Sequence, residues 1–411
     1  MQKAQKLLEN AREMVICWQR EMTARPALGP ENGGQGEAEK AAWLLAELRG
    51  MGIEDIQTFP APDSRVPGGV RPNICARIPG KSARTLWIVG HMDVVPPGDL
   101  QLWHSPPYEL QVDADHVVGR GVEDNQQAIV TGMLVAKALL EGNLVPDLGL
   151  GLLLVSDEET GMTHGLPHVL DAAPGLVAQD DIVLVPDFGN ARGDFVEVAE
   201  KSVLWLKVTV TGRQCHASRP NDGLNSLVVA SEAILALQEL YRIFPDNDPL
   251  FHPAWSTFVP SKKEANVENI NTLPGKDVFY VDCRVLPSCS LEDVERECRS
   301  LLQAVAERTG AAIKVDVVHV APSLGRTDPS TPQVQRLLRA LREVRGTEGR
   351  ISGSGGQTVA VVLRNRQLPA VVWSTILLNP HTPNERSSIS NTILDAKVVL
   401  AMLFDTSGEQ V

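Results

Sequence analysis

Residues 85–96 read TLWIVGHMDVVP, an apolar run that ends in His91 and Asp93. Two further apolar runs, at 148–155 and 182–185, also end in polar or charged groups. Continuous apolar runs are typical of strands in a sheet that helices cover on both faces. Because α/β sheets hold their ligands at the carboxyl ends of the strands, we expect a site at this edge.

A different pattern begins near Ser202, where SVLWLKVTV alternates as a strand with one exposed face does. The order of expected elements from there is β-α-β-β-α-β, which is the ferredoxin-like order. They comprise 202–210, 225–244, 254–259, 277–285, a helix from Ser290, and 312–320. Exposed edges of such a sheet favour pairing with a second copy of the chain, so we expect a homodimer.

After about Pro322 the α/β pattern returns, with helices at 331–344 and 391–404 around a strand at 368–373. The sequence therefore predicts an α/β catalytic domain with a mixed sheet and helices on both faces. An α+β, ferredoxin-like lid and dimerisation domain is inserted into it. The expected boundaries are 1–200 and 321–411 for the catalytic domain and 201–320 for the lid. At the start of the chain, two helices are expected before residue 55.

Composition excludes several classes of protein. The 411 residues include 51 acidic and 38 basic ones, a net charge of −13, which argues against nucleic acid or an anionic membrane as a partner. No stretch reaches the roughly 18 apolar residues of a membrane helix. The first 22 residues carry charges throughout, unlike a signal peptide. Six scattered cysteines without a CxxC pair fit a reducing cytoplasm, so a cytoplasmic location is expected.

The side chains at the predicted strand ends are of the types that bind metal ions. His91 and Asp93 share a face of their strand, and a metal-bound imidazole usually donates its second N–H to a carboxylate such as Asp93. Asp124, in GRGVEDN, precedes a helix, where an Asp is more often an N-cap than a ligand. Alone, each residue also has a structural explanation.

Further candidates follow the other strands. Asp157, Glu158 and Glu159 end the run LLLV, Asp187 ends IVLVP, and His381 lies in the loop LLNPHTPNE. Adjacent like charges raise at least one pKa unless a cation compensates. The proposed ligand set is His91, Asp124, Glu159, Asp187 and His381.

Two imidazoles and three carboxylates without a thiolate suit two divalent cations, Zn²⁺ first, with Co²⁺ or Mn²⁺ as alternatives. Two metals about 3.5–4 Å apart clamp the attacking and leaving oxygens in hydrolysis. Glu158 is then the candidate general base. HExxH is absent, and His164 and His168 are separated by Gly165 and Pro167, so no helical zincin site is expected.

The order HxD, GRGxxD, EE, PD and a late His resembles the dinuclear zinc aminoacylase–carboxypeptidase G family over nearly the whole chain. Acetylornithine deacetylase, succinyl-diaminopimelate desuccinylase and related di- and carboxypeptidases belong to that family. The resemblance implies that His91 and Asp187 hold one metal and Glu159 and His381 the other. It also implies that Asp124 bridges them, that Glu158 is the base, and that Asp93 stands behind His91.

The same resemblance assigns roles in the lid. His216, in GRQCHASRP, would reach the active site of the partner subunit and stabilise the oxyanion. Asn271, in NTLPG, would contact substrate, and Arg284, in VDCR, would bind the substrate carboxylate. A lone His is more often structural, and an arginine in a surface salt bridge contributes little.

The stretch SGSGGQTVA, residues 352–360, resembles the glycine-rich substrate loop of the family. Gly355, Gly356 and Thr358 are its candidate substrate contacts, with backbone N–H groups forming a nest for a carboxylate. Many family members have Thr-Asp or Ser-Asp after the glycines, whereas this chain has Gln357-Thr358. A Rossmann motif is disfavoured because the GxGxxG spacing is missing.

These residues favour a two-metal amidohydrolase acting on a small N-acyl amino acid that bears a carboxylate. N-Succinyl-diaminopimelate is the first expected substrate and N-acetylornithine the second. A di- or carboxypeptidase acting on short peptides is the alternative within hydrolysis. A metal-stabilised binding protein without catalysis is the alternative of another class, and the intact Glu158 argues against it. An aminopeptidase would need an acidic anchor for the substrate amine, and no clear candidate stands out.

Overall fold

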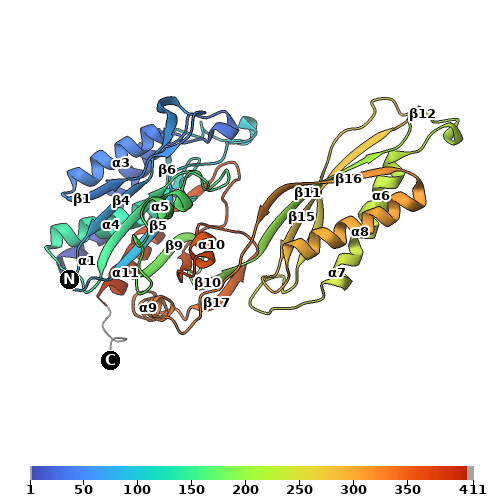
Figure 1. Ribbon diagram of the computed structural model, residues 1–411. Coiled ribbons are helices and arrows are strands. Elements are labelled where there is room, and N and C mark those ends of the chain that lie inside the picture. Colours follow the sequence, from blue (N-terminus) through green and yellow to red (C-terminus); the bar gives the residue numbers. More distant parts are fainter. Residues whose placement is uncertain (1, 405–411) are drawn as a thin grey trace. The chain divides into compact units, whose positions relative to one another are not determined.

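The computed structural model describes residues 2–404, which divide into two compact units (Figure 1). Within the described residues, the first unit comprises 2–198, 326–352 and 358–404, and the second comprises Ala199–Gly325 and Gly353–Gln357. The short segment 353–357, which contains the two candidate glycines, therefore groups with the inserted unit, whereas the sequence placed it in the catalytic domain. Thr358 belongs to the first unit.

Three helices open the chain, where the sequence predicted two: α1 (Gln2–Glu9), α2 (Arg12–Thr23) and α3 (Ala38–Gly50). The expected first helix breaks at Asn10, whose side chain donates a hydrogen bond to the Lys6 carbonyl and ends α1. Asparagine competes in this way with the helical hydrogen bonds of the backbone, and a charge pattern alone does not reveal it.

A mixed sheet of eight strands forms the centre of the first unit, in the order β1-β4-β8-β5-β9-β18-β10-β17. The strands β8, β5, β9 and β18 are mutually parallel, so their carboxyl ends meet at one edge. In sheet order, the bounds of the eight strands are β1 Asp55–Thr58, β4 Ile74–Ile78, β8 Gly149–Val155, β5 Thr85–His91, β9 Ile182–Gly189, β18 Val371–Ser374, β10 Phe195–Glu200 and β17 Arg350–Ser354.

Helices cover both faces of this sheet, as the continuous apolar strands predict. On one face, α4 (Gln126–Gly142) contacts β5, and Gly132 allows it to approach the side chains of Ile88 and Leu152. The helices α1, α2 and α11 (Ile389–Leu403) pack against α4. On the other face, residues of α5 (Leu166–Ala172) and α10 (Ala360–Asn365) share a buried cluster with Trp87, Val89 and Val185. The helix α9 (Pro332–Ala340) contacts α11 and β9.

A small sheet, in the order β19-β7-β6, fixes the positions of two loops beside the carboxyl edge of the large sheet. The strand β19 (Arg386–Ser388) pairs antiparallel with β7 (His116–Val118), which pairs with β6 (Gln111–Asp113). This pairing brings the loop after β7 next to the loop before β19, although about 260 residues separate them in the chain. Another short pair joins β2 (Ala61–Pro62) to β3 (Val70–Arg71).

The second unit has the ferredoxin-like order that the sequence predicted. Its antiparallel sheet runs β13-β15-β11-β16, and α6 and α8 pack on one face over a core that includes Leu206, Val208 and Phe279. The bounds are β11 Ser202–Thr211, α6 Ser226–Ala236, α7 Leu240–Ile243, β13 Thr257–Lys263, β15 Lys276–Val285, α8 Leu291–Thr309 and β16 Ala312–Ala321. The Ser290 hydroxyl caps α8 by accepting from the backbone N–H of Asp293, as its Ser-x-x-Asp sequence indicates.

Among residues 2–404, no helix is both long enough and apolar enough to cross a membrane. All six cysteines are free thiols. Each unit is therefore stabilised by its own buried core and polar contacts, without disulfides.

Candidate metal centre

The carboxyl edge of the large sheet gathers the acidic and imidazole groups that the sequence singled out. His91 ends β5, Glu158 and Glu159 follow β8, and Asp187 lies near the end of β9. Asp124 comes from the loop after β7 and His381 from the loop before β19. His91 is 1% exposed, so its two ring nitrogens need partners within the protein.

Asp124 lies between the two histidines. Its Oδ1 is 2.9 Å from His91 Nε2, and its Oδ2 is 3.1 Å from His381 Nε2. The helix α4 begins at Gln126 after Asn125, and no side chain caps it, so Asp124 is not an N-cap. A carboxylate whose two oxygens face two different imidazoles has the geometry that a bridging ligand needs.

The two remaining candidate ligands, Asp187 and Glu159, each lie near one of these histidines. Asp187 Oδ1 is 3.6 Å from His91 Nε2, and Glu159 Oε2 is 3.2 Å from His381 Nε2. Ligand atoms of His91, Asp124 and Asp187 lie within 4.8 Å of one another, and so do those of Asp124, Glu159 and His381. These two groups share Asp124. A third such group joins His91, Glu158 and Glu159, so Glu158 is also within reach of a cation.

The charges at this edge fit divalent cations. Hydrogen bonds to Asp124 and Glu159 raise the pKa of His381 to about 10. Burial lowers the pKa of His91, but its hydrogen bonds to Asp124 and Asp187 outweigh burial and leave that pKa well above the usual value. Burial also raises the pKa of Glu159 to about 7. Protons on the histidines therefore balance the acids here, and an oxygen- and nitrogen-binding cation would fill that role.

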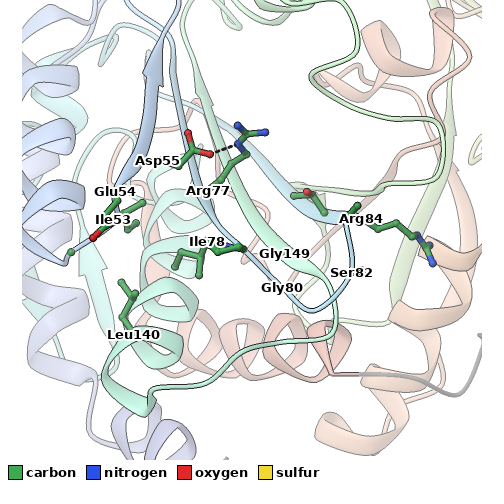
Figure 2. A pocket seen from close by; sticks show the side chains of 14 residues that line it. Ile53, Glu54, Asp55, Arg77, Ile78, Gly80, Ser82, Arg84, Leu140 and Gly149 are labelled. Carbon is green, nitrogen blue, oxygen red and sulfur yellow. Dashed lines mark hydrogen bonds and ion pairs between the residues drawn. The ribbon is translucent and has the colours of Figure 1, made fainter.

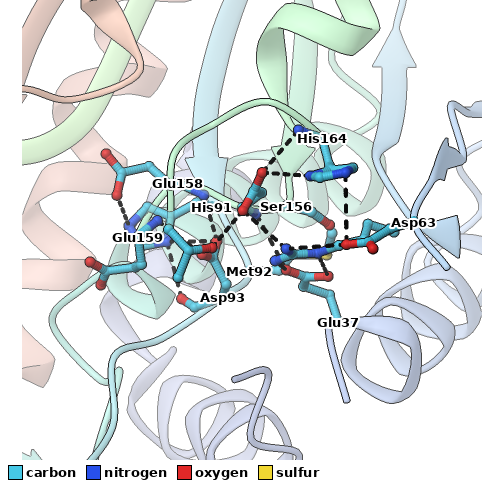
Figure 3. A network of polar contacts seen from close by, with 12 residues as sticks. Glu37, Asp63, His91, Met92, Asp93, Ser156, Glu158, Glu159 and His164 are labelled. Atoms are coloured by element: carbon cyan, nitrogen blue, oxygen red, sulfur yellow. Dashed lines mark hydrogen bonds and ion pairs between the residues drawn. The ribbon is translucent and has the colours of Figure 1, made fainter. Parts of the chain in front are cut away.

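Asp93 has a broader role than the sequence suggested. His91 Nδ1 is 3.1 Å from the carbonyl oxygen of Asp93 and 3.5 Å from its carboxylate. The carboxylate accepts hydrogen bonds from the backbone N–H groups of Glu158, at 3.1 Å, and Glu159, at 3.0 Å (Figure 3). Asp93 thus links the end of β5 to the acidic turn after β8, and the His91 Nε2 atom is left facing the cluster.

Asp157 fixes the same turn from the other side. It has a left-handed backbone with φ of 64°, which is unusual outside glycine. Its carboxylate accepts from the backbone N–H of His164 and from Arg71, whose guanidinium also pairs with Glu37. Arg71 and Glu37 are almost fully buried, so removing Arg71 would leave the buried Glu37 carboxylate without its ion-pair partner.

Lys40 holds the backbone of the His91–Asp93 segment through a hydrogen bond. Its Nζ donates to the carbonyl of Met92 at 2.8 Å, and the side chain is 1% exposed. Burial lowers the pKa of Lys40 to about 8, although Asp93 and Glu37 act in the opposite direction. The role of Lys40 could not be predicted from the sequence, because a lysine in a helix is normally solvated.

The buried Lys40 makes stability depend on pH in the metal-free protein. Because its folded pKa lies below the unfolded value of 10.5, the unfolded chain binds more protons between pH 8 and 10.5, and stability rises across that window. Relative to a Lys40→Met variant, wild-type protein should gain about 3 kcal/mol of unfolding free energy over this range. Urea unfolding of both proteins in the presence of a chelator measures this gain, and parallel stability curves would contradict it.

Asn125 is another residue that the sequence analysis missed. Its side-chain oxygen accepts from the backbone N–H of His91, and its Nδ2 donates to Asp187 Oδ1 at 2.7 Å. Asn125 is 1% exposed and connects the ends of β5 and β9. Its position directly after Asp124 was the only available signal.

In the second unit, the short ladder between β12 (Cys215–His216) and β14 (Thr272–Leu273) brings His216 next to Asn271. Asn271 accepts from the backbone N–H of Ala217 through its carbonyl. The exposed His216 ring accepts from the backbone N–H of Ser218 at Nδ1. The neutral imidazole then carries its proton on Nε2, which makes it a hydrogen-bond donor there.

Arg284 and the glycine segment also meet in the second unit. Arg284 donates to the Asp282 carboxylate through Nε and to the Gly355 carbonyl through Nη1. Gly356 accepts from the Ser354 hydroxyl. None of the glycines of segment 353–357 has a positive φ, so the alternating backbone of a nest is not formed here. Thr358, in the first unit, accepts from the backbone N–H of Ala360 at the start of α10.

Gln357, the departure from the family pattern, has a structural role. Its Nε2 donates to the carbonyl oxygens of Lys201, at 2.9 Å, and Ala321, at 3.0 Å. These residues lie at the first and last strands of the second unit, next to the points where the chain enters and leaves it. An aspartate could not donate these two hydrogen bonds, because an ionised carboxylate only accepts.

A separate cavity of about 660 Å³ lies at the opposite end of β5 and β8 (Figure 2). Arg77 and Asp55 form an ion pair at its wall, and Ile78, Gly80 and Gly149 also line it. None of the candidate ligands reaches this cavity. It has no converging chemical groups of the kind found at the carboxyl edge.

Comparisons with known proteins give matches over most of the chain. A family model described as "Peptidase family M20/M25/M40" matches residues 87–405. An uncharacterized metallohydrolase from Methanococcus maripaludis is 33% identical over 398 residues, covering 92% of this chain and 95% of that protein. A succinyl-diaminopimelate desuccinylase from Gluconacetobacter diazotrophicus is 26% identical over 388 residues, covering 93% and 94%. The fold also matches human carnosine dipeptidase 1, with a TM-score of 0.78 at 15% identity over 98% of both chains.

Proposed function

Because the chain belongs to peptidase family M20/M25/M40, we propose that it is a two-metal amidohydrolase that removes an N-acyl group from a carboxylate-bearing amino acid. Members of this family are metal-dependent hydrolases of amide or peptide bonds, so the reaction class and the use of divalent metal follow from membership. The number of metals, zinc as their identity, and the substrate are our proposals.

One observation carries the two-metal proposal: the two carboxylate oxygens of Asp124 face His91 and His381 separately. His91, Asp124 and Asp187 would hold one cation, and Asp124, Glu159 and His381 the other. When bound, such cations would polarise the scissile carbonyl and lower the pKa of water. Nitrogen and carboxylate ligands without thiolates suit zinc, with cobalt and manganese as alternatives.

Glu158 is the proposed general base. It follows Asp157, and Asp93 holds its backbone N–H. Burial raises the pKa of Glu158 well above the usual value of a glutamate, which makes its carboxylate a stronger base. Glu158 takes a proton from the attacking water and returns it to the leaving amine. This order balances the protons of amide hydrolysis without another acid.

His216 and Arg284 are proposed to act on the substrate. The Nε2–H of His216 is a suitable donor to a developing oxyanion. Arg284 retains N–H groups beyond those that Asp282 and Gly355 accept, since a guanidinium has five. These groups would bind the carboxylate of the amino acid, with Asn271, Gly355, Gly356 and Thr358 as further proposed contacts.

A homodimer is also proposed. The edge strand β16 exposes Val317, Val318 and Val320, and their exposed fractions of 39%, 53% and 54% are high for valines in a sheet. Unpaired strand edges with apolar side chains favour pairing with another chain. A cytoplasmic location stays a prediction from composition.

A substrate panel tests the proposed reaction. Purified protein loaded with Zn²⁺ or Co²⁺ is assayed with N-succinyl-diaminopimelate, N-acetylornithine and a set of dipeptides. Turnover of N-acyl amino acids in preference to dipeptides is expected. Turnover of peptides alone would support the metal-dependent hydrolysis but contradict the deacylase assignment. If metal-loaded protein hydrolyses neither class of substrate, both the proposed hydrolysis and the deacylase assignment are contradicted.

A further inference from the structure

Two buried carboxylates that are not candidate ligands connect the two loops of the metal centre. Glu385 is 0% exposed and Glu123 is 3% exposed, yet neither belongs to a potential ligand group among the described residues. Glu123 lies next to Asp124, and Glu385 lies four residues after His381. Buried carboxylates this close to a metal centre need specific partners.

Glu385 reaches across to the loop of Asp124. Its Oε1 accepts from the backbone N–H groups of Glu123, at 2.9 Å, and Asp124, at 3.0 Å. Its Oε2 accepts from the backbone N–H of Gly121 at 2.9 Å and from the Arg120 guanidinium at 2.7 Å. With four donors directed at two oxygens, this carboxylate is fully used within the protein.

Glu123 reaches in the opposite direction, to the loop of His381. Its Oε2 accepts from the backbone N–H of Leu377 at 2.6 Å. Its Oε1 accepts from the backbone N–H and the side-chain Nδ2 of Asn379, at 3.0 and 3.1 Å. Each loop thus contributes one carboxylate that holds the backbone of the other, and we call Glu123 and Glu385 the reciprocal carboxylates.

The loop of His381 needs such support. Leu378, His381 and Asn384 all have left-handed backbones, with φ of 60°, 62° and 59°. Non-glycine residues hold this conformation only where the surroundings fix it. The His381 side chain is also 54% exposed, so packing alone does not fix its position.

We propose that Glu123 and Glu385 are positioning residues that set the distance and orientation between Asp124 and His381, so that one carboxylate can serve two cations. This inference rests on the proposed two-metal function. Glu385 holds the backbone N–H of Asp124 itself, whose carboxylate both cations would share. Glu123 holds only the loop of His381, which would serve one cation.

The two variants should therefore differ. Glu123→Gln keeps the shape of the side chain but turns an amide N–H₂ towards a backbone N–H. It should weaken one cation by about 10- to 100-fold and leave the other unchanged. Glu385→Gln should weaken both cations by a similar factor. The measurement is titration of metal-depleted protein with Co²⁺, followed by visible absorption and by competition with a chromophoric chelator.

Glu197→Gln is the matched control, because Glu197 is equally buried and pairs with Arg364 away from the cluster. It should lower the thermal stability of the metal-free protein without changing either Co²⁺ affinity. If the Glu123 and Glu385 variants behave like this control, the reciprocal carboxylates are ordinary fold contacts and the inference is wrong. If Glu385→Gln does not fold, the selective loss of one site in Glu123→Gln decides the question.

The failure of the inference is distinguishable from the failure of the proposed function. Wild-type protein that binds no Co²⁺ at micromolar concentration would contradict the two-metal centre itself. Wild-type protein that binds two equivalents, together with variants that bind both with unchanged affinity, would contradict only the positioning roles of Glu123 and Glu385.

Discussion

Replacing Glu158 with glutamine is expected to lower kcat by about 10²- to 10⁴-fold while metal content stays the same. Glutamine has nearly the same shape but cannot accept the proton of the attacking water. KM should change little, because Glu158 is proposed to act on water and not to anchor the substrate. Steady-state kinetics and metal analysis on the same preparation give both quantities.

Metal content is the control within this experiment. Ligand atoms of Glu158 lie within 4.8 Å of those of His91 and Glu159, which is close enough for a direct contact with a cation. Loss of one metal equivalent in Glu158→Gln would reassign Glu158 as a ligand. Retained turnover at the wild-type rate would remove it from the chemistry altogether.

Replacing Asp124 with alanine is expected to abolish tight binding of both metals and all measurable turnover. A shared carboxylate contributes to both sites, whereas His381→Ala should release one metal only. The distinction follows from the geometry, in which Asp124 faces both histidines and His381 faces only Asp124 and Glu159. Metal analysis after gel filtration without added metal measures the equivalents retained.

Asp181 provides the matched control for the loss of a buried carboxylate. It is 6% exposed, lies just before β9, and accepts from the indole N–H of Trp87 at the edge opposite the metal centre. Asp181→Asn should lower stability and retain both metals. Release of a single equivalent from Asp124→Ala would mean that the carboxylate serves one cation and does not bridge.

Much of the fold could be predicted because periodicity is a local property. The runs that became β5, β8 and β9 are apolar throughout, as expected for strands covered on both faces, and β11 alternates as a strand with one covered face does. The ferredoxin-like order of the second unit is confirmed by its sheet order. The break at Asn10 was missed because it depends on one side-chain hydrogen bond.

Four of the five candidate ligands could be found because each follows an apolar strand or a glycine-rich turn, whereas His381 lies in a loop and was found through the family resemblance. The residues that support them could not, since support here means contact with backbone N–H or carbonyl groups from distant parts of the chain. Glu385 contacts residues more than 260 positions away, and its sequence neighbours give no sign of this. Glu123 and Lys40 were hidden for the same reason.

The departure at Gln357 shows another limit. Because Gln357 lies in the expected glycine-rich substrate loop, its difference from the family pattern raised doubt about which substrate the protein binds. In the structure it donates to Lys201 and Ala321, so the amide is explained by contacts within the second unit. A substitution in a motif can therefore report on the scaffold and not on the ligand, and only the three-dimensional contacts separate these cases.

Reconstitution of metal-depleted protein tests whether this chain is a two-metal amidohydrolase. Zn²⁺ or Co²⁺ is added stepwise, and bound metal and hydrolysis of N-succinyl-diaminopimelate, N-acetylornithine and dipeptides are measured on the same samples. We expect two equivalents of metal per chain and turnover that appears as they bind. Protein that binds neither metal, or that binds two equivalents and hydrolyses no amide in the panel, would contradict the two-metal amidohydrolase proposal.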